Sequence, residues 1–241
     1  KVYVDELQDR ASIIEAIKNE PLERNPNEQY VYSDLGLILL AEIIEEVSGQ
    51  RIDTYVRSQL YYPMGMFSTF FTPKKVGIWY TEFIPPTERD TLFRMELIQA
   101  DVHDERAYYM DGVAGHAGLF STSIDIAKYI TLLTNKGFYA GQQFISSERI
   151  DEFTSTQTSL SGRGLGFDKK SRSGFSSAGT LMSPRSFGHT GFTGTSFWVD
   201  PEHRLGVIIL TNRVHPYRSY GGKINWVRAA VADIAFESIA Q

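Results

Sequence analysis

Two short motifs place side chains suited to acyl transfer far apart in the sequence. Tyr-Ser-Asp occupies residues 32–34, and His-Thr-Gly at 189–191 is followed by Phe-Thr-Gly at 192–194. Acyl transfer through a serine needs a nucleophile, a base beside it and N–H donors for the oxyanion. A tyrosine at a helix entry can project its phenol into a cleft, and glycines in a strand let a substrate backbone approach closely. We therefore predict that both motifs serve one acyl-transfer site.

Apolar residues at helical spacing predict the elements that hold the first motif. We expect helices over residues 6–20, 35–47 and 52–60, with Asp34 opening the second and Ser-Gly at 48–49 ending it. Residues 63–118 are predicted to be irregular. A fourth helix is expected over 124–135, capped by Ser121 or Ser123, and a fifth over 148–153 after Ser146. The first motif thus lies at the start of a strong helix.

A β-meander is predicted to hold the second motif. Residues 155–188 are rich in Ser and Gly, which indicates loops, and could hold a short strand at 164–167. Strands are expected at 187–190, 195–199 and 204–211, followed by a closing helix over 224–239. Residues 205–210 carry no charge and do not alternate, as in strands buried on both faces and paired on both edges. Further strands must therefore come from upstream of Lys1 or from another chain.

The composition is that of a globular protein and excludes several functions. Of the 241 residues, 42% are hydrophobic and 22% charged, and the net charge of −5 argues against a nucleic-acid binder. Cysteine is absent, which excludes disulfides, thiolate zinc sites and a cysteine nucleophile. No apolar run approaches the ~20 residues that span a membrane. The chain begins at Lys1 without an initiator Met, so we expect a processed protein or a fragment.

In this order and context the motifs resemble those of the serine β-lactamase and penicillin-binding-protein family. Tyr-Ser-Asp is similar to the Tyr-x-Asn motif of class C β-lactamases, their esterase relatives and D-Ala-D-Ala carboxypeptidases, and His-Thr-Gly is similar to their Lys-Thr-Gly motif. The Gly-rich turn at 115–122 and the last strand pair at 199–212 agree. Residues 86–88 and 102–105 resemble a bacterial branch of these hydrolases, some of them fused behind family 3 glycoside hydrolase domains.

The resemblance implies an α/β (α+β) fold of the β-lactamase/transpeptidase type, with an antiparallel sheet flanked by helices and a mainly helical region. We expect residues 1–155 to form that helical region and residues 156–241 to be part of the α/β region, in one incomplete domain. In the family, a Ser-x-x-Lys motif upstream of the tyrosine supplies the nucleophile. No lysine here follows a serine by three positions, and only 31 residues precede Tyr32. We therefore expect the N-terminal helix, strands and nucleophile to lie outside this chain, and the chain alone to be inactive.

The resemblance also implies a role for each site residue. Tyr32 and the absent lysine move the proton of the absent serine, while His189 and Thr190 polarise Tyr32 and contact the substrate. The backbone N–H of Phe192 holds the oxyanion together with that of the serine. Asp34 stands where the family has Asn, and an ionised carboxylate cannot donate to a substrate carbonyl, which leaves esters open as substrates. The predicted set is Tyr32 and His189 as catalytic residues, with Asp34, Thr190, Gly191, Phe192 and Thr193 as oxyanion and substrate-binding residues.

Each candidate also has a structural explanation. Tyr32 could be a core tyrosine at a helix start, and His189 an ordinary strand histidine. The His-Asp-Glu run at 103–105 and His116 suggest a metal, but their spacing matches no ligand pattern, so we expect neither a metal nor another cofactor. Arg213, after the last strand, could meet a substrate carboxylate, although a surface ion pair is the default.

Two functions remain open at this level. The first is part of a serine hydrolase that acts on an ester, amide or peptidoglycan-like substrate through an acyl-enzyme. The second is a non-catalytic module that binds glycan or peptidoglycan fragments and is appended to a glycosidase. By resemblance we expect a bacterial protein of the periplasm or exterior, with no nucleic-acid partner and no membrane span. We also expect residues 204–211 to be covered by the missing N-terminal portion or by self-association.

Overall fold

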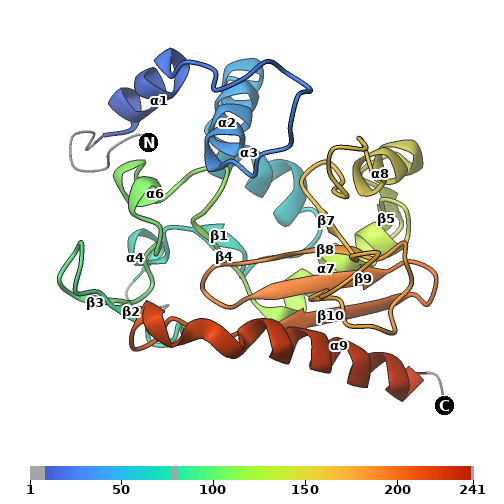
Figure 1. Ribbon diagram of the computed structural model, residues 1–241. Helices are drawn as coiled ribbons and strands as arrows, with labels where there is room; N and C mark the ends of the chain where they lie inside the picture. Colours follow the sequence, from blue (N-terminus) through green and yellow to red (C-terminus); the bar gives the residue numbers. More distant parts are fainter. Residues whose placement is uncertain (1–8, 78–80, 240–241) are drawn as a thin grey trace. The chain divides into compact units, whose positions relative to one another are not determined.

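The chain forms two compact units in the computed structural model (Figure 1). The structure describes residues 9–77 and 81–239. The first unit comprises Lys1–Ser121 and His215–Tyr217, and the second comprises Thr122–Val214 and Arg218–Gln241. The helices between residues 123 and 154 belong to the second unit, so the boundary at residue 155 suggested by the sequence does not coincide with the boundary between the compact units. As a division by element type it stays a prediction.

Helices dominate the first unit. Its longer helices are α1 (Arg10–Asn19) and α2 (Asp34–Ser48), and the shorter ones are α3 (Ile52–Val56), the π-helix η1 (Arg57–Tyr61), α4 (Pro73–Val76) and α6 (Glu105–Tyr109). Two small antiparallel pairs accompany them, β1 (Phe70–Phe71) with β4 (Leu119–Phe120) and β2 (Glu88–Arg89) with β3 (Leu97–Ile98). A buried apolar cluster joins α1, α2 and α6; it contains Ile13, Ile14, Ile17, Ile38, Val102, Ala107, Met110 and Ala114.

Helix α2 confirms the predicted element that follows the first motif. It begins after Ser33, and Asp34 lies in its first turn, where a carboxylate interacts favourably with the helix dipole. It ends at Gly49, whose left-handed backbone (φ 67°) favours a residue without a Cβ. The Gly-rich turn approaches this helix closely, since a Cβ on Gly115 would lie 2.0 Å from the carbonyl oxygen of Leu37. The glycine therefore lets the turn pack directly on the helix backbone.

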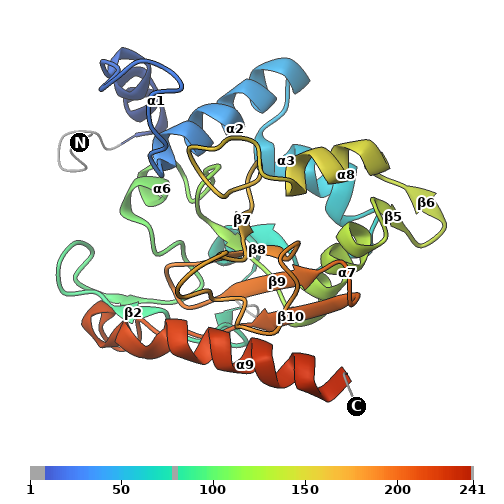
Figure 2. The same cartoon turned by 45° about the vertical axis from the view of Figure 1, so that its right-hand side comes forward.

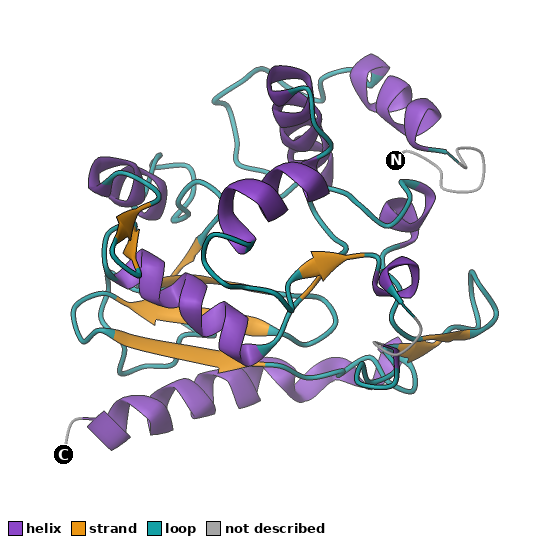
Figure 3. Cartoon of the chain, turned by 180° about the vertical axis from the view of Figure 1, so that it is seen from behind, coloured by secondary structure: helices purple, strands orange, loops and turns teal. Residues whose placement is uncertain are grey.

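An antiparallel sheet in the order β10-β9-β8-β7 forms the centre of the second unit (Figure 2). Its strands are β7 (Asp168–Lys169), β8 (Phe187–Thr190), β9 (Ser196–Asp200) and β10 (Leu205–Ile209). Helix α7 (Ser123–Thr134) packs on one face and α9 (Ile224–Ile239) on the other (Figure 3). Helix α8 (Ser147–Thr154), the 3-10 helix η2 (Arg218–Lys223) and the pair β5 (Phe138–Tyr139) and β6 (Gln142–Gln143) complete the unit. None of the described helices has the length and apolar character that crossing a bilayer requires.

Strand β10 has two covered faces and one paired edge. Val207 packs with Trp198 and Ala232 on the α9 side, and Ile208 packs against the cluster around Ile130 on the α7 side. Apolar contacts on both faces are what the charge-free sequence predicts, although Val207 is the one residue of the strand that is buried. Within the part of the chain that the structure describes, β10 pairs with β9 alone.

Two local predictions are wrong. The N-cap of α7 is Thr122, whose hydroxyl accepts a backbone N–H of the first turn, rather than Ser121 or Ser123. Residues 164–167 form a tight turn instead of a strand, because the N–H of Gly164 donates to the carbonyl of Phe167 at 3.0 Å. The strand in this region is β7, which begins directly after that turn.

Candidate active site

The first motif lies at the end of an exposed segment that leads into α2. Residues 18–33 are all exposed, and 57% of the Tyr32 surface is accessible. Ser33 is extended (φ −140°), so the backbone becomes helical only at Asp34, which is half-buried. The explanation of Tyr32 as a core tyrosine is therefore wrong, and its ring is accessible to a substrate.

His189 in β8 is held in one tautomer. Its Nδ1 lies 2.9 Å from the carbonyl oxygen of Thr190, which can only accept, so Nδ1 carries the proton. Its Nε2 lies 2.6 Å from Nη2 of Arg163, which can only donate, so Nε2 is the acceptor. Burial is the main cause that lowers the pKa of His189; the bond to the Thr190 carbonyl opposes it, and the charge of Arg163 adds to it. The imidazole is thus neutral near pH 7.

Residues 191–195 form a tight turn between β8 and β9, referred to below as the 191–195 turn. The N–H of Gly191 donates to the carbonyl of Thr195 at 2.7 Å, and the N–H of Gly194 donates to the carbonyl of Gly191 at 3.1 Å. Gly194 has φ 114°, and a Cβ there would lie 2.2 Å from Oγ1 of Thr211. A residue other than glycine would therefore distort the turn. Phe192 lies within it and is 60% exposed.

Arg228 of α9 binds the carbonyl oxygens of the 191–195 turn. Only 4% of its surface is accessible, and its Nη2 lies 2.9 Å from the oxygen of Gly191 and 2.8 Å from that of Thr195. Its Nη1 donates to Oδ1 of Asn225 at 3.0 Å. The peptide that contains the Gly191 carbonyl also contains the N–H of Phe192. A guanidinium on that oxygen therefore orients and polarises the predicted oxyanion donor.

A second guanidinium, that of Arg213, reaches the turn from the loop that follows β10 (Leu205–Ile209). Nε of Arg213 lies 2.7 Å from the carbonyl oxygen of Phe192, and the guanidinium lies 4.7 Å from the centroid of the Phe192 ring. The backbone N–H of Arg213 donates to the carbonyl of Thr193 at 2.9 Å. The structure thus gives Arg213 a contact with the turn in place of the surface ion pair expected by default.

The structure gathers the residues of the second motif on β8 and the turn that follows it. His189 and Thr190 end the strand, Gly191, Phe192 and Thr193 begin the turn, and three arginines bind them. Tyr32 and Asp34 belong to the first unit, and the catalytic roles of all these residues stay predictions.

Sequence reasoning missed two of these arginines. Arg163 lies in a Ser/Gly-rich stretch that gives no signal. Arg228 interrupts an apolar helix, and a charged residue at such a position is a signal that could have been followed.

Two histidines of the first unit, His103 and His116, bind carboxylates. Nε2 of His103 lies 2.7 Å from Glu88, and Nε2 of His116 lies 2.9 Å from Asp104; both imidazoles are buried. Burial raises the pKa of Asp104, but the hydrogen bond and charge of His116 outweigh it, so this pKa lies below its ordinary value. Among the described residues, no three His, Cys, Asp or Glu side chains gather in a way that could hold a metal ion.

A serine, an aspartate and a histidine also meet in the second unit, but not in a catalytic order. Oγ of Ser183 lies 2.7 Å from one oxygen of Asp200, and Nδ1 of His203 lies 2.8 Å from the other. In a nucleophilic triad the histidine lies between the serine and the aspartate. Here the buried carboxylate binds both partners, so this cluster fixes the β9–β10 turn and does not activate Ser183.

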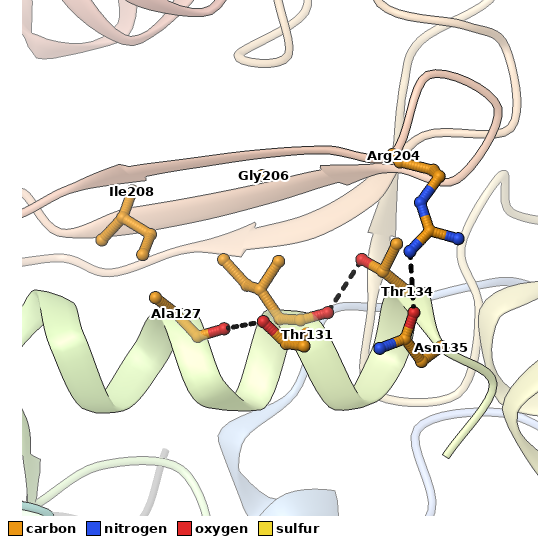
Figure 4. Close-up of a pocket in the computed structure, with 8 residues that line it drawn as sticks. Ala127, Thr131, Thr134, Asn135, Arg204, Gly206 and Ile208 are labelled. Atoms are coloured by element: carbon orange, nitrogen blue, oxygen red, sulfur yellow. Dashed lines mark hydrogen bonds between the residues drawn. The ribbon is translucent and has the colours of Figure 1, made fainter. Parts of the chain in front are cut away.

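A pocket of about 280 Å³ opens between α7 and β10 (Figure 4). The hydroxyls of Thr131 and Thr134 donate to helix carbonyls, and Arg204 donates to Oδ1 of Asn135 at 3.0 Å. The lining residues are Ala127, Ile130, Thr131, Thr134, Asn135, Arg204, Gly206 and Ile208. No predicted site residue lines this pocket, so it is separate from the candidate active site.

The sequence matches the family described as Beta-lactamase over residues 2–232. The chain belongs to this family. Similar relatives include the "Putative D-alanyl-D-alanine carboxypeptidase" of Escherichia coli (strain K12), 37% identical over 220 residues, and the protein of the same name from Salmonella agona (strain SL483), 35% identical over 224 residues. The matches cover 86% of this chain and 50% and 51% of those relatives. The chain therefore spans about half the length of the curated relatives it matches.

Solved structures of β-lactamases and penicillin-binding proteins share the fold. A β-lactamase from Mycobacterium bovis aligns with a TM-score of 0.64 at 20% identity, covering 90% of this chain and 67% of that one. An octameric penicillin-binding protein homologue from Pyrococcus abyssi aligns with a TM-score of 0.63 at 20% identity, covering 95% and 48%. At this identity the likeness concerns the fold alone. It confirms the β-lactamase/transpeptidase-like fold that the motifs predicted.

Proposed function

We propose that this chain is the later part of a serine hydrolase that cleaves an ester or amide through an acyl-enzyme, with the nucleophilic serine outside the chain. The observation that carries the proposal is the 191–195 turn, whose Gly191–Phe192 peptide has its carbonyl on the buried guanidinium of Arg228. A cation on the carbonyl oxygen of a peptide strengthens the N–H of the same peptide as a hydrogen-bond donor to an oxyanion. A glycan-binding module has no comparable need of such an arrangement.

Peptidoglycan stem peptides that end in D-Ala-D-Ala, or esters that mimic them, are the proposed substrates. The names of the relatives support this class. We propose with it that the protein acts in the periplasm or outside a bacterial cell. Asp34 bears on the choice between amide and ester, because an ionised carboxylate accepts an N–H but cannot donate to a carbonyl. Asp34 therefore lacks the N–H that an asparagine would offer to a substrate amide carbonyl, which leaves esters open as substrates.

The upstream sequence is proposed to supply the serine and a strand that covers β10. Two features support this. β10 has apolar contacts on both faces but pairs with β9 alone among the described strands, and the pocket lined by Gly206 and Ile208 opens beside it. Alternatively, a second copy of the chain covers the edge of β10 that does not pair with β9. Sedimentation separates the two, since a monomer that includes the upstream sequence favours the first and a dimer favours the second.

The test of the hydrolase proposal compares the 241-residue chain with the protein that includes its upstream sequence. Both are incubated with a fluorescent penicillin, a fluorophosphonate and an acylated Lys-D-Ala-D-Ala peptide, and adducts are measured by intact mass. We expect a stoichiometric adduct and release of D-Ala with the longer protein only. An adduct on the 241-residue chain would place the nucleophile within it. A longer protein that binds peptidoglycan fragments without acylation would instead be the binding module.

A further inference from the structure

We propose that Arg163 supplies a fixed positive charge to this site and holds His189 as a neutral hydrogen-bond acceptor, so that His189 is a positioning residue rather than a titrating base. Both ring nitrogens of His189 are engaged within the second unit, Nδ1 with the carbonyl of Thr190 and Nε2 with Arg163. The Lys-Thr-Gly motif that this one resembles carries its cation in the motif itself. Here the cation reaches the strand from a residue 26 positions earlier.

The guanidinium of Arg163 is held by two acceptors at once. Its Nη2 lies 2.6 Å from Nε2 of His189, and its Nη1 lies 3.3 Å from Oδ1 of Asp168 at the start of β7. The planar fork of a guanidinium suits such a bridge, whereas a lysine offers a single point charge. Only 23% of the Arg163 side chain is accessible, so water competes weakly for these contacts. Asp168 thus fixes the direction from which the cation approaches the imidazole.

The charged neighbours of His189 act on it in opposite directions. Arg163 lowers the pKa of His189 and Asp168 raises it, while the residue opposite on β9 is the uncharged Phe197. Protonation of His189 would put a proton on Nε2 and turn the acceptor of Arg163 into a second donor. Acid therefore breaks the contact. At neutral and basic pH the site keeps its cation, because a guanidinium does not titrate there.

The direct test is the state of His189 in the protein that includes its upstream sequence. Imidazole ¹⁵N chemical shifts report tautomer and pKa, with the resonance assigned by its loss in His189→Gln. We expect the Nδ1–H tautomer at pH 7, a raised pKa in Arg163→Gln and a lowered pKa in Asp168→Asn. Arg172→Gln, which removes an exposed arginine of the same unit, is the control and should leave the titration unchanged. An Nε2–H tautomer, or shifts of the same sign in both variants, would overturn the proposal.

The catalytic meaning of this contact rests on the proposed hydrolase function and has its own readout. In Arg163→Gln we expect kcat/KM for an acylated Lys-D-Ala-D-Ala peptide to fall about tenfold at pH 7. The acid limb of the pH profile should also move to higher pH, because His189 then protonates more readily. A purely structural Arg163 would lower kcat/KM equally at every pH. Arg163→Lys keeps the positive charge but cannot contact His189 and Asp168 with two separate nitrogens. This variant replaces Arg163→Gln in the test if the glutamine variant does not fold. If no form of the protein turns over, the proposed function fails, while the ¹⁵N measurement still decides the state of His189.

Discussion

The two motifs of the candidate site are held in opposite ways. Residues 18–33, which lead up to α2, are all exposed, and the backbone of the first motif becomes regular at the start of α2. The 191–195 turn instead receives hydrogen bonds from Arg228, 33 and 37 positions away, and from Arg213. A turn fixed by guanidinium groups is preorganised before a substrate binds. The second motif therefore takes its geometry from tertiary contacts within its unit, and the first motif lies where an exposed segment enters a helix.

Replacing Arg228 should have the largest effect and remove this difference. Arg228→Met leaves two turn carbonyls without their guanidinium donor, and an unsatisfied buried acceptor costs about 1–3 kcal/mol. We expect the free energy of unfolding to fall by about 3 kcal/mol and acylation to slow by about 10²-fold, as when an oxyanion donor is lost. Urea unfolding measures the first effect and stopped-flow acylation measures the second, both on the protein that includes the proposed upstream sequence. Arg172→Met is the control, and acylation at the normal rate in Arg228→Met would mean that the turn is positioned by other contacts.

A pair of glycine variants tests the same difference between the two motifs, with a smaller expected effect. Gly49→Ala at the end of α2 adds only the strain of a left-handed backbone, because a Cβ there meets no atom within 4 Å. Gly194→Ala adds strain and a contact of 2.2 Å with Oγ1 of Thr211. We expect losses of about 1 kcal/mol for Gly49→Ala and about 2–3 kcal/mol for Gly194→Ala, with slower acylation only in the latter. Equal losses in thermal or urea unfolding would argue that the turn yields as easily as the exposed helix end.

Elements that are defined by local sequence signals were predicted well from the sequence. Strand β8 and helix α9 have the predicted bounds, 187–190 and 224–239, because apolar periodicity and nearby glycines define them locally. Helix α2 differs from its prediction by one residue at each end. The pairs β1–β4 and β2–β3 were not predicted, since two-residue strands have no periodicity to read. Local sequence signals therefore predict the helix and the strand on which the two motifs lie.

The contacts that complete the site could not be predicted in the same way. Arg163 lies in a Ser/Gly-rich stretch, and nothing in its neighbours indicates that it folds against His189. Arg228 gives a weak signal, as a charge within an apolar helix, but the sequence does not reveal which carbonyls it binds. Residues 164–167 look like a strand locally and form a turn. Each of these cases depends on a partner that is brought close only by the tertiary fold.

Asp34→Asn tests the helix side of the site with a smaller effect on stability. Loss of a carboxylate from the first turn of α2 removes its interaction with the helix dipole, which we expect to cost about 0.3–1 kcal/mol. The new side-chain amide can donate to a substrate carbonyl, and an amide carbonyl is a stronger acceptor than an ester carbonyl, so turnover of an amide relative to the matching ester should rise. The ratio of kcat/KM for a peptide and a depsipeptide of the same sequence measures this. Arg228→Met serves as the contrast, because it should slow both substrates alike.

Tyr32→Phe should change stability least and still abolish most of the activity. The ring is 57% exposed, and a surface substitution of this kind changes the free energy of unfolding by no more than about 0.5 kcal/mol. Loss of the phenolic proton carrier should slow acylation by about 10²-fold or more, as expected for general acid–base catalysis. Arg228→Met loses activity because a preorganised turn is lost, whereas Tyr32→Phe would lose it with the fold intact. If Tyr32→Phe destabilised the protein as much as Arg228→Met, both motifs would be held by contacts of similar strength.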